Sequence, residues 1–283
     1  LEANTTADNN TAVGIQALTA NTTGTQNTAV GHDALADNTT ASNNTAVGFS
    51  ALGNNTTGQL NTAVGHRSMI TTTTGGFNTA FGAESLEANT EGVNNVAVGW
   101  RSQHNTTTGQ QNTSVGTSSL AQITTANNNT AIGYLAMTAT TSGVENAAVG
   151  SLALDANTTG QTNSAFGAFA LGANTTGDSN TAVGQAALVA NTTANNNTAC
   201  GYRTLVSNTT GNVNTAVGGL ALDANTTGVE QTAVGYNALS ASTTSTGNTA
   251  IGRSALANVT TGNNNAAIGH DAGVDITTGS NNF

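Results

Sequence analysis

The stretch Asn27-Thr28-Ala29-Val30-Gly31 decides the fold, because close copies of this pentapeptide recur along the whole chain at one fixed distance. Every interval between the final glycines is 17 residues, with no insertion or deletion over 16 copies. Self-similarity at a fixed period is the signature of a repeat architecture. These motif glycines are Gly14, Gly31, Gly48, Gly65, Gly82, Gly99, Gly116, Gly133, Gly150, Gly167, Gly184, Gly201, Gly218, Gly235, Gly252 and Gly269.

Each position of the repeat tolerates a different range of residues. Asn stands four residues before the motif glycine except at Gln231, and Ala stands two before it except at Ser114. Leu or Met stands four residues after it except at Gln103 and Gly273, and Thr stands eight after it in every copy. The positions one, two, five and six after the glycine vary freely, which is typical of residues that face solvent.

A period of 17 is too short for paired-helix repeats, which need about 33 residues or more. Abundant β-branched Thr and Val, with regular glycines, also disfavour helices. The pattern therefore predicts an all-β fold: a β-solenoid (β-roll) with one coil per 17-residue repeat, about 16 coils in all, and residues 1–283 as a single repeat array. An inserted residue would turn a strand to the wrong face, and Pro, which removes a ladder donor, is absent.

Side-chain alternation along a strand divides the motif between two faces. We expect Val30 and Leu35 to fill the coil interior and Ala29 to face outward. One Val and one Leu per coil is a thin core, and ordering each residue costs about 1–2 kcal/mol of backbone entropy. We therefore expect further burial against another chain. The Ala column from Ala12 to Ala267 is expected to form an exposed strip of methyl groups on which another copy of the chain packs.

Three further columns are expected to hold successive coils together. We expect the side-chain amides of Asn27 and its equivalents to form a hydrogen-bonded ladder between successive coils. At Gly31 we expect a positive φ or a close approach of two backbone segments at a corner of the coil. Thr39 is expected to satisfy backbone groups at a second corner.

Composition excludes several classes of protein. Charged residues make up 6% of the chain and the net charge is −10, so no basic patch is available for nucleic-acid phosphates. No apolar run approaches the roughly 20 residues of a membrane span. A single Cys gives no disulfide framework. Neither end carries a polar capping coil, which isolated solenoids need, so we expect a segment of a longer fibre or an open-ended filament.

The carboxylates, histidines and the single cysteine, which could act in catalysis or bind a metal, are scattered along the sequence. The densest acidic cluster, Glu84, Glu87 and Glu91, is interpreted as a solvated acidic face. Cys200 replaces the usual Val, so we expect it to be buried. His32 and His66 share a column two coils apart, too far to bind one metal; His104 and His270 lie in other repeats. We expect no catalytic set, no metal site and no cofactor.

Aromatic residues follow the motif glycine in several repeats, namely Phe49, Trp100, Tyr134, Tyr202 and Tyr236. Two interpretations are open. They form a broken exposed stripe that contacts sugars or a neighbouring chain, or they pack at the edge of the Ala strip.

The hexapeptides Asn9-Asn10-Thr11-Ala12-Val13-Gly14 and Asn43-Asn44-Thr45-Ala46-Val47-Gly48 resemble the head repeats of trimeric autotransporter adhesins of the YadA type. They are also similar to repeats in phage and viral tail-fibre proteins. The resemblance covers essentially the whole chain, although the repeat here is longer by an Asn-Thr-Thr-Gly segment. It implies left-handed coils, a homotrimer, an extracellular place on a cell surface or a virion or phage appendage, and a cell-surface or glycan receptor.

These observations favour a non-catalytic structural or adhesive fibre or filament shaft. The alternative is a surface-binding solenoid such as an ice-binding protein, with Asn21 and Thr23 sharing an outer face. Ile123, Val259 and Ile276 interrupt the Asn column of that face. Asn4 belongs to the same column as Asn21. Asn4, Asn21, Asn38 and Asn157 are in Asn-X-Thr sequons, which would carry glycans after eukaryotic secretion.

Overall fold

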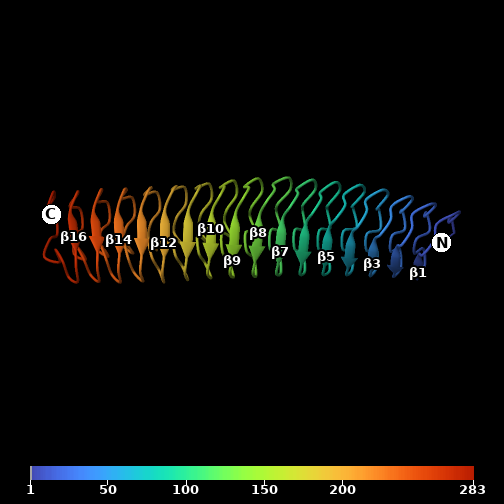
Figure 1. Ribbon diagram of the computed structural model, residues 1–283, viewed down its shortest axis with the longest axis horizontal. Helices are drawn as coiled ribbons and strands as arrows, with labels where there is room; N and C mark the ends of the chain where they lie inside the picture. Colours follow the sequence, from blue (N-terminus) through green and yellow to red (C-terminus); the bar gives the residue numbers. More distant parts are fainter. Residues whose placement is uncertain (1) are drawn as a thin grey trace. The chain divides into compact units, whose positions relative to one another are not determined.

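The computed structural model describes residues 2–283, which contain no helix and one short β-strand in each repeat (Figure 1). The predicted all-β solenoid is confirmed. The chain divides into two compact units, of which the first ends at Val144 and the second covers Glu145–Phe283. Each unit holds eight strands.

The strands of the first unit are β1 (Thr11–Val13), β2 (Thr28–Val30), β3 (Thr45–Val47), β4 (Thr62–Val64), β5 (Thr79–Phe81), β6 (Val96–Val98), β7 (Thr113–Val115) and β8 (Thr130–Ile132). The strands of the second unit are β9 (Ala147–Val149), β10 (Ser164–Phe166), β11 (Thr181–Val183), β12 (Thr198–Cys200), β13 (Thr215–Val217), β14 (Thr232–Val234), β15 (Thr249–Ile251) and β16 (Ala266–Ile268).

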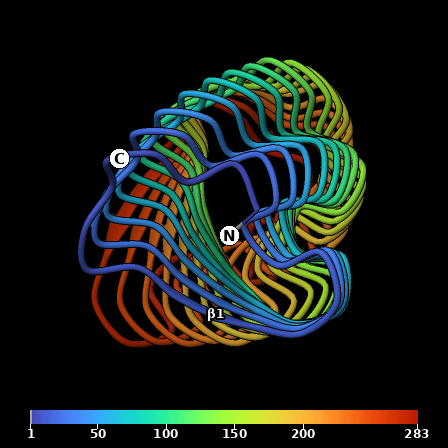
Figure 2. The ribbon, with the colours of Figure 1, turned by 90° about the vertical axis from the view of Figure 1, so that its right-hand side faces the viewer.

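Within each unit, consecutive strands pair in parallel, and each residue lies opposite its equivalent in the next repeat. β2 and β3 show the register, with Ala29 opposite Ala46. Backbone hydrogen bonds also join the coils outside the strands; the Leu35 amide, for example, donates to the Ala51 carbonyl at 3.1 Å. Seen end-on, successive coils of a unit follow the same course (Figure 2). One repeat is therefore one coil, as predicted.

The strand faces are the reverse of those expected from the sequence. Ala29 is fully buried and lies in the core cluster with Leu35. Val30 is only partly buried, and its equivalent Val183 is 40% exposed. The prediction of an Ala strip open to another chain is wrong, because the Ala column lines the interior and the Val column faces outward.

The narrowness of the coil explains this reversal. The largest fully buried side chains are nearly all from the Leu column, with Ile123 as an exception. Each coil thus has room for about one large side chain. Beside Leu35 the inner face of the strand admits only a methyl group, so Ala29 packs inward and alternation turns Val30 out.

The other predicted ladders are confirmed. Asn27 donates from Nδ2 to the Ala41 carbonyl at 2.8 Å, and its Oδ1 accepts the Asn44 amide at 3.0 Å. Thr39 donates from Oγ1 to the Thr56 carbonyl at 3.1 Å. Gly31 has φ of 141°, and an added Cβ would clash with the Gly48 carbonyl oxygen.

Each coil also contains left-handed residues that are not glycine. In the third coil these are Asn43, Ser50 and Leu52, with φ of 62°, 50° and 51°. A left-handed residue costs roughly 1–2 kcal/mol, and burial of a Leu side chain, worth about 1.5–3 kcal/mol, offsets that cost. The tight corners therefore depend on the buried Leu column.

Candidate functional site

The outward columns of the strands form a continuous uncharged surface in each unit, which we name the outer sheet face. It consists of the residues three before and one before each motif glycine, Thr28 and Val30 in β2. In all 16 strands these positions hold only Thr, Val, Ile, Phe, Ala, Ser or Cys. Phe81 and Val183 are 57% and 40% exposed there.

Cys200 lies on the outer sheet face and is exposed. The prediction that it is buried is wrong for the same reason as for Val30: its column points out of the coil. Its thiol is therefore accessible on a surface that carries no charged neighbour within its own strand, β12.

The five aromatic residues that follow motif glycines are all about half exposed, from Phe49 at 48% to Tyr134 at 55%. They cannot pack beside an Ala strip, because that strip is inside the coil. Phe49 stacks between His32 and His66, with ring centroids 5.3 and 5.4 Å apart. The ring of Phe49 thus separates the two histidines.

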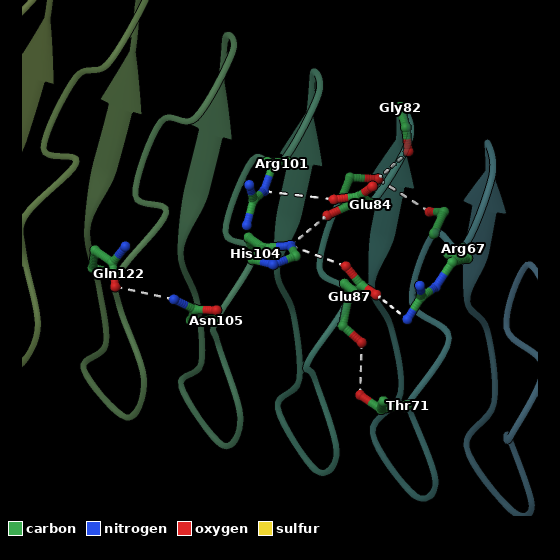
Figure 3. A network of polar contacts seen from close by, with 11 residues as sticks. Arg67, Thr71, Gly82, Glu84, Glu87, Arg101, His104, Asn105 and Gln122 are labelled. Atoms are coloured by element: carbon green, nitrogen blue, oxygen red, sulfur yellow. Dashed lines mark hydrogen bonds and ion pairs between the residues drawn. The ribbon is translucent and has the colours of Figure 1, made fainter.

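A polar network joins three coils of the first unit (Figure 3). The Glu87 carboxylate pairs with the Arg67 guanidinium, with Oε1 2.6 Å from Nη2, and its Oε2 lies 3.2 Å from His104 Nδ1. Glu84 pairs with Arg101 at 3.5 Å, and its carbonyl lies 3.3 Å from His104 Nδ1. The interpretation of Glu84 and Glu87 as a solvated acidic face is therefore wrong, because both carboxylates are half-buried and paired with cationic or imidazole side chains.

Glu84, Glu87 and His104 offer ligand atoms within 4.8 Å of one another, and all three are half-buried. Arg67 and Arg101 already pair with the two carboxylates, so a cation would compete with both arginines. The network therefore joins adjacent coils through ion pairs in which two arginines balance two carboxylates. Glu91, the third member of the predicted acidic face, is exposed.

The Asn21 column is internal, contrary to the expectation that Asn21 and Thr23 share an outer face. Asn21 is fully buried, donates to the Gly24 carbonyl at 3.0 Å and accepts Asn38 Nδ2 at 2.9 Å. Only Thr23 of this pair is exposed. Sequons at Asn21, Asn38 and Asn157 are buried within this ladder, so a glycan on these side chains is incompatible with the folded coil.

Two exceptions to the repeat pattern compensate each other inside the first unit. Gln103 replaces Leu and Ser114 replaces Ala, and Gln103 Nε2 donates to Ser114 Oγ at 2.9 Å. Both are fully buried, and Ser102 bonds to Ser114 as well. This pairing of exceptions 11 residues apart is the signal that could have placed the Ala column opposite the Leu column.

We expect the double substitution Gln103→Leu with Ser114→Ala to stabilise the chain by about 1–3 kcal/mol. It removes Gln103 Oε1, a buried oxygen without a hydrogen-bond partner. Gln103→Leu alone should gain less, because the Ser114 hydroxyl then loses one partner. Urea unfolding of the two singles and the double measures the coupling; strictly additive effects would contradict the pairing.

Asp223 is half-buried, and burial raises the pKa of its carboxyl, with partial opposition from backbone hydrogen bonds and Arg203. Its Oδ1 is buried without a partner. Because the pKa of Asp223 is raised in the folded chain, its protonated carboxyl contributes to the stability of the fold. That contribution is fully present below the ordinary pKa of 3.8 and is lost as the pH rises through the folded-state pKa. Burial also raises the pKa of Asp155, in the equivalent position.

We therefore expect Asp223→Asn and Asp155→Asn to raise the melting temperature at pH 7, with the gain shrinking as the pH approaches 3. Thermal unfolding of each variant beside the parent chain between these pH values measures the effect. A gain that grows toward low pH would overturn the assignment.

The fold and its exposed columns define the class as a β-solenoid repeat protein. Comparisons with protein-family models, curated proteins and solved structures found no match to this chain. The similarity of the motif to adhesin and tail-fibre repeats stays a prediction. Among the described residues, no helix is long and apolar enough to cross a membrane.

Proposed function

We propose that the chain is a non-catalytic structural shaft, a segment of an extracellular fibre or filament on a cell surface or a virion or phage appendage. In this proposal it associates with copies of itself through the outer sheet face. The trimeric form follows from the resemblance of the Asn-Thr-Ala-Val-Gly motif to head repeats of YadA-type adhesins.

The observation that carries the proposal is the absence of charge from the outer sheet face. The chain has 18 Asp, Glu, Lys and Arg residues in all, and none occupies any of the 16 strands. Depletion of charge is the compositional mark of an interface core. Exposed Val, Ile and Phe along the same column add apolar area that association would bury.

Light scattering across a range of protein concentrations tests the proposal. A mass near three times 27.8 kDa is expected for the chain. Val183→Glu with Val217→Glu, both on the outer sheet face, should shift the mass toward a single chain. Thr176→Glu with Thr210→Glu is the matched control, because these exposed residues add the same charge away from the strands.

Cys200 gives a second readout without substitution. Mild oxidation should link two chains covalently at micromolar concentration if the outer sheet faces meet. A single-chain mass at every concentration, with no faster cross-linking than a free thiol shows, would refute the proposal.

The second candidate is binding to an ordered surface such as ice. It is favoured by the in-register Thr residues of the outer sheet face, which include Thr28, Thr45 and Thr62, instead of the Asn21 and Thr23 pair. An ice-recrystallisation assay tests it. Inhibition by the parent chain that disappears in Val183→Glu with Val217→Glu would support it, and no inhibition would remove it.

A further inference from the structure

A groove of about 360 Å³ crosses the surface of the first unit, over the coils that begin the array. Its lining comes from the positions two, five and six after the motif glycine, away from the outer sheet face. Position five is small in three successive coils, where it is Thr19, Ala36 and Gly53, and it becomes Ile70 in the next. The groove is therefore open where this column lacks a large side chain, and Ile70 lies at its end.

The lining combines two carboxylates with neutral hydrogen-bonding groups. Asp33 is half-buried and Asp37 is exposed, and no lining residue carries a positive charge. Gln16 and Asn54 add side-chain amides to the lining. His32 Nδ1 lies 2.9 Å from Asp33 Oδ2, so this contact uses one oxygen of that carboxylate. The groove is thus rich in hydrogen-bond acceptors and carries negative charge.

Where the groove ends, the same columns of the repeat show which group spans them. Arg67, at position two, reaches Glu87, at position five of the next coil, with Nη2 2.6 Å from Oε1 (Figure 3). A guanidinium thus crosses from one of these columns to the other and is held there by a carboxylate. Among the described residues, no arginine forms an ion pair with Asp33 or Asp37.

We propose that the groove binds a guanidinium group, the head of an exposed arginine side chain on a partner protein. A guanidinium is a planar fork of N–H donors that stays charged, so it satisfies acceptors on several sides of the groove at once. An ammonium group is a compact and strongly hydrated charge, so it leaves more of these acceptors to water. The net charge of −10 also attracts a cationic partner and repels another copy of the chain.

The site lies within one chain and goes beyond the shaft function, so it does not depend on self-association. Saturation-transfer NMR with N-acetyl-arginine methylamide tests it, because this method observes the small probe whatever the mass of the protein. We expect a dissociation constant of about 1–10 mM. The citrulline analogue, which has the same shape without the charge, should bind more weakly. No binding of the arginine probe up to about 50 mM, or equal binding of the citrulline analogue, would overturn the proposal.

Asp33→Asn with Asp37→Asn should weaken binding of the arginine probe about tenfold, because both charges of the groove are lost. Asparagine tolerates the left-handed φ of 57° at position 33, so the backbone can keep its course. Asp8→Asn with Glu91→Gln is the matched control, since it removes two exposed carboxylates of the same unit outside the groove. Equal weakening in both double variants would reduce the effect to net charge and overturn the site.

Ala36→Ile separates the shape of the groove from its charge. It gives position five the side chain that Ile70 has two coils later, where that side chain is half-buried like Ala36, and it keeps both aspartates. We expect it to weaken the arginine probe as much as the loss of the two carboxylates does, and circular dichroism verifies the fold. Unchanged affinity would mean that the probe binds elsewhere.

The remaining arginines of the chain, Arg203 and Arg253, test the choice of partner. In light scattering, Arg203→Gln with Arg253→Gln should leave the mass of the assembly unchanged if the groove receives an arginine from a different protein. A lower mass would place an arginine of another copy in the groove and overturn that choice.

Discussion

Replacement of Gly48 by alanine is expected to lower the free energy of unfolding by about 3–5 kcal/mol. Gly48 has φ of 136°, and an added Cβ would lie 2.5 Å from the carbonyl oxygen of Gly65. Relief of that contact requires the coils to separate, which weakens ladder bonds such as the one from the Gly48 amide to the Val30 carbonyl at 2.8 Å. Urea unfolding followed by circular dichroism measures the loss.

Gly53→Ala is the matched control in the same coil. Gly53 has no positive φ, and an added Cβ would meet its nearest atom, the Ser50 carbonyl oxygen, at 3.4 Å. Alanine there should be neutral or stabilise by up to about 1 kcal/mol, because it restricts the unfolded chain. Equal losses in the two variants would show that close approach at the motif glycine is not what excludes other residues.

The periodicity of the sequence was sufficient to predict the coil, but the inward and outward faces were assigned wrongly for the Val30 and Ala29 columns and for the Asn21 column. An invariant spacing of 17 residues fixes parallel, in-register strands, and the Asn27, Gly31 and Thr39 ladders follow from repetition alone. The assignment of Val30 to the interior used apolar character as the criterion. It failed because coil width, which depends on how the corners fold, decides which of two apolar residues is inside.

Much of the candidate site depends on distances between coils that no single repeat contains. Glu87 and His104 are equivalent positions in adjacent repeats, so a sequence reading that placed residues 17 apart side by side would have joined them. The paired exceptions Gln103 and Ser114 hold similar information. The φ angles were needed as well, because the sequence does not separate glycines that the backbone requires, such as Gly48, from those it does not, such as Gly53.

Asn61→Leu is expected to destabilise the chain by about 3–6 kcal/mol. Asn61 is fully buried, and its Nδ2 donates to the Gly75 carbonyl at 2.9 Å while its Oδ1 accepts the Asn78 amide at 3.0 Å. Leucine leaves both groups without a partner away from water. Asn43→Leu is the control, because Leu60 occupies the equivalent exposed position one coil later with a similar φ; its effect should be no more than about 1–2 kcal/mol, the cost of a left-handed leucine in place of asparagine.

The chain itself contains a compensated exception in this ladder. Gln231 occupies the Asn column, and its Oε1 accepts Ser242 at 2.9 Å and Ser245 at 3.0 Å. Asn61→Gln should destabilise, because Thr72 and Gly75 stand where those two serines would be. Ser242→Ala with Ser245→Ala should also destabilise in urea unfolding, because Gln231 Oε1 then loses both donors. Unchanged stability in that double variant would mean that pairing of the buried amide groups does not hold this ladder together.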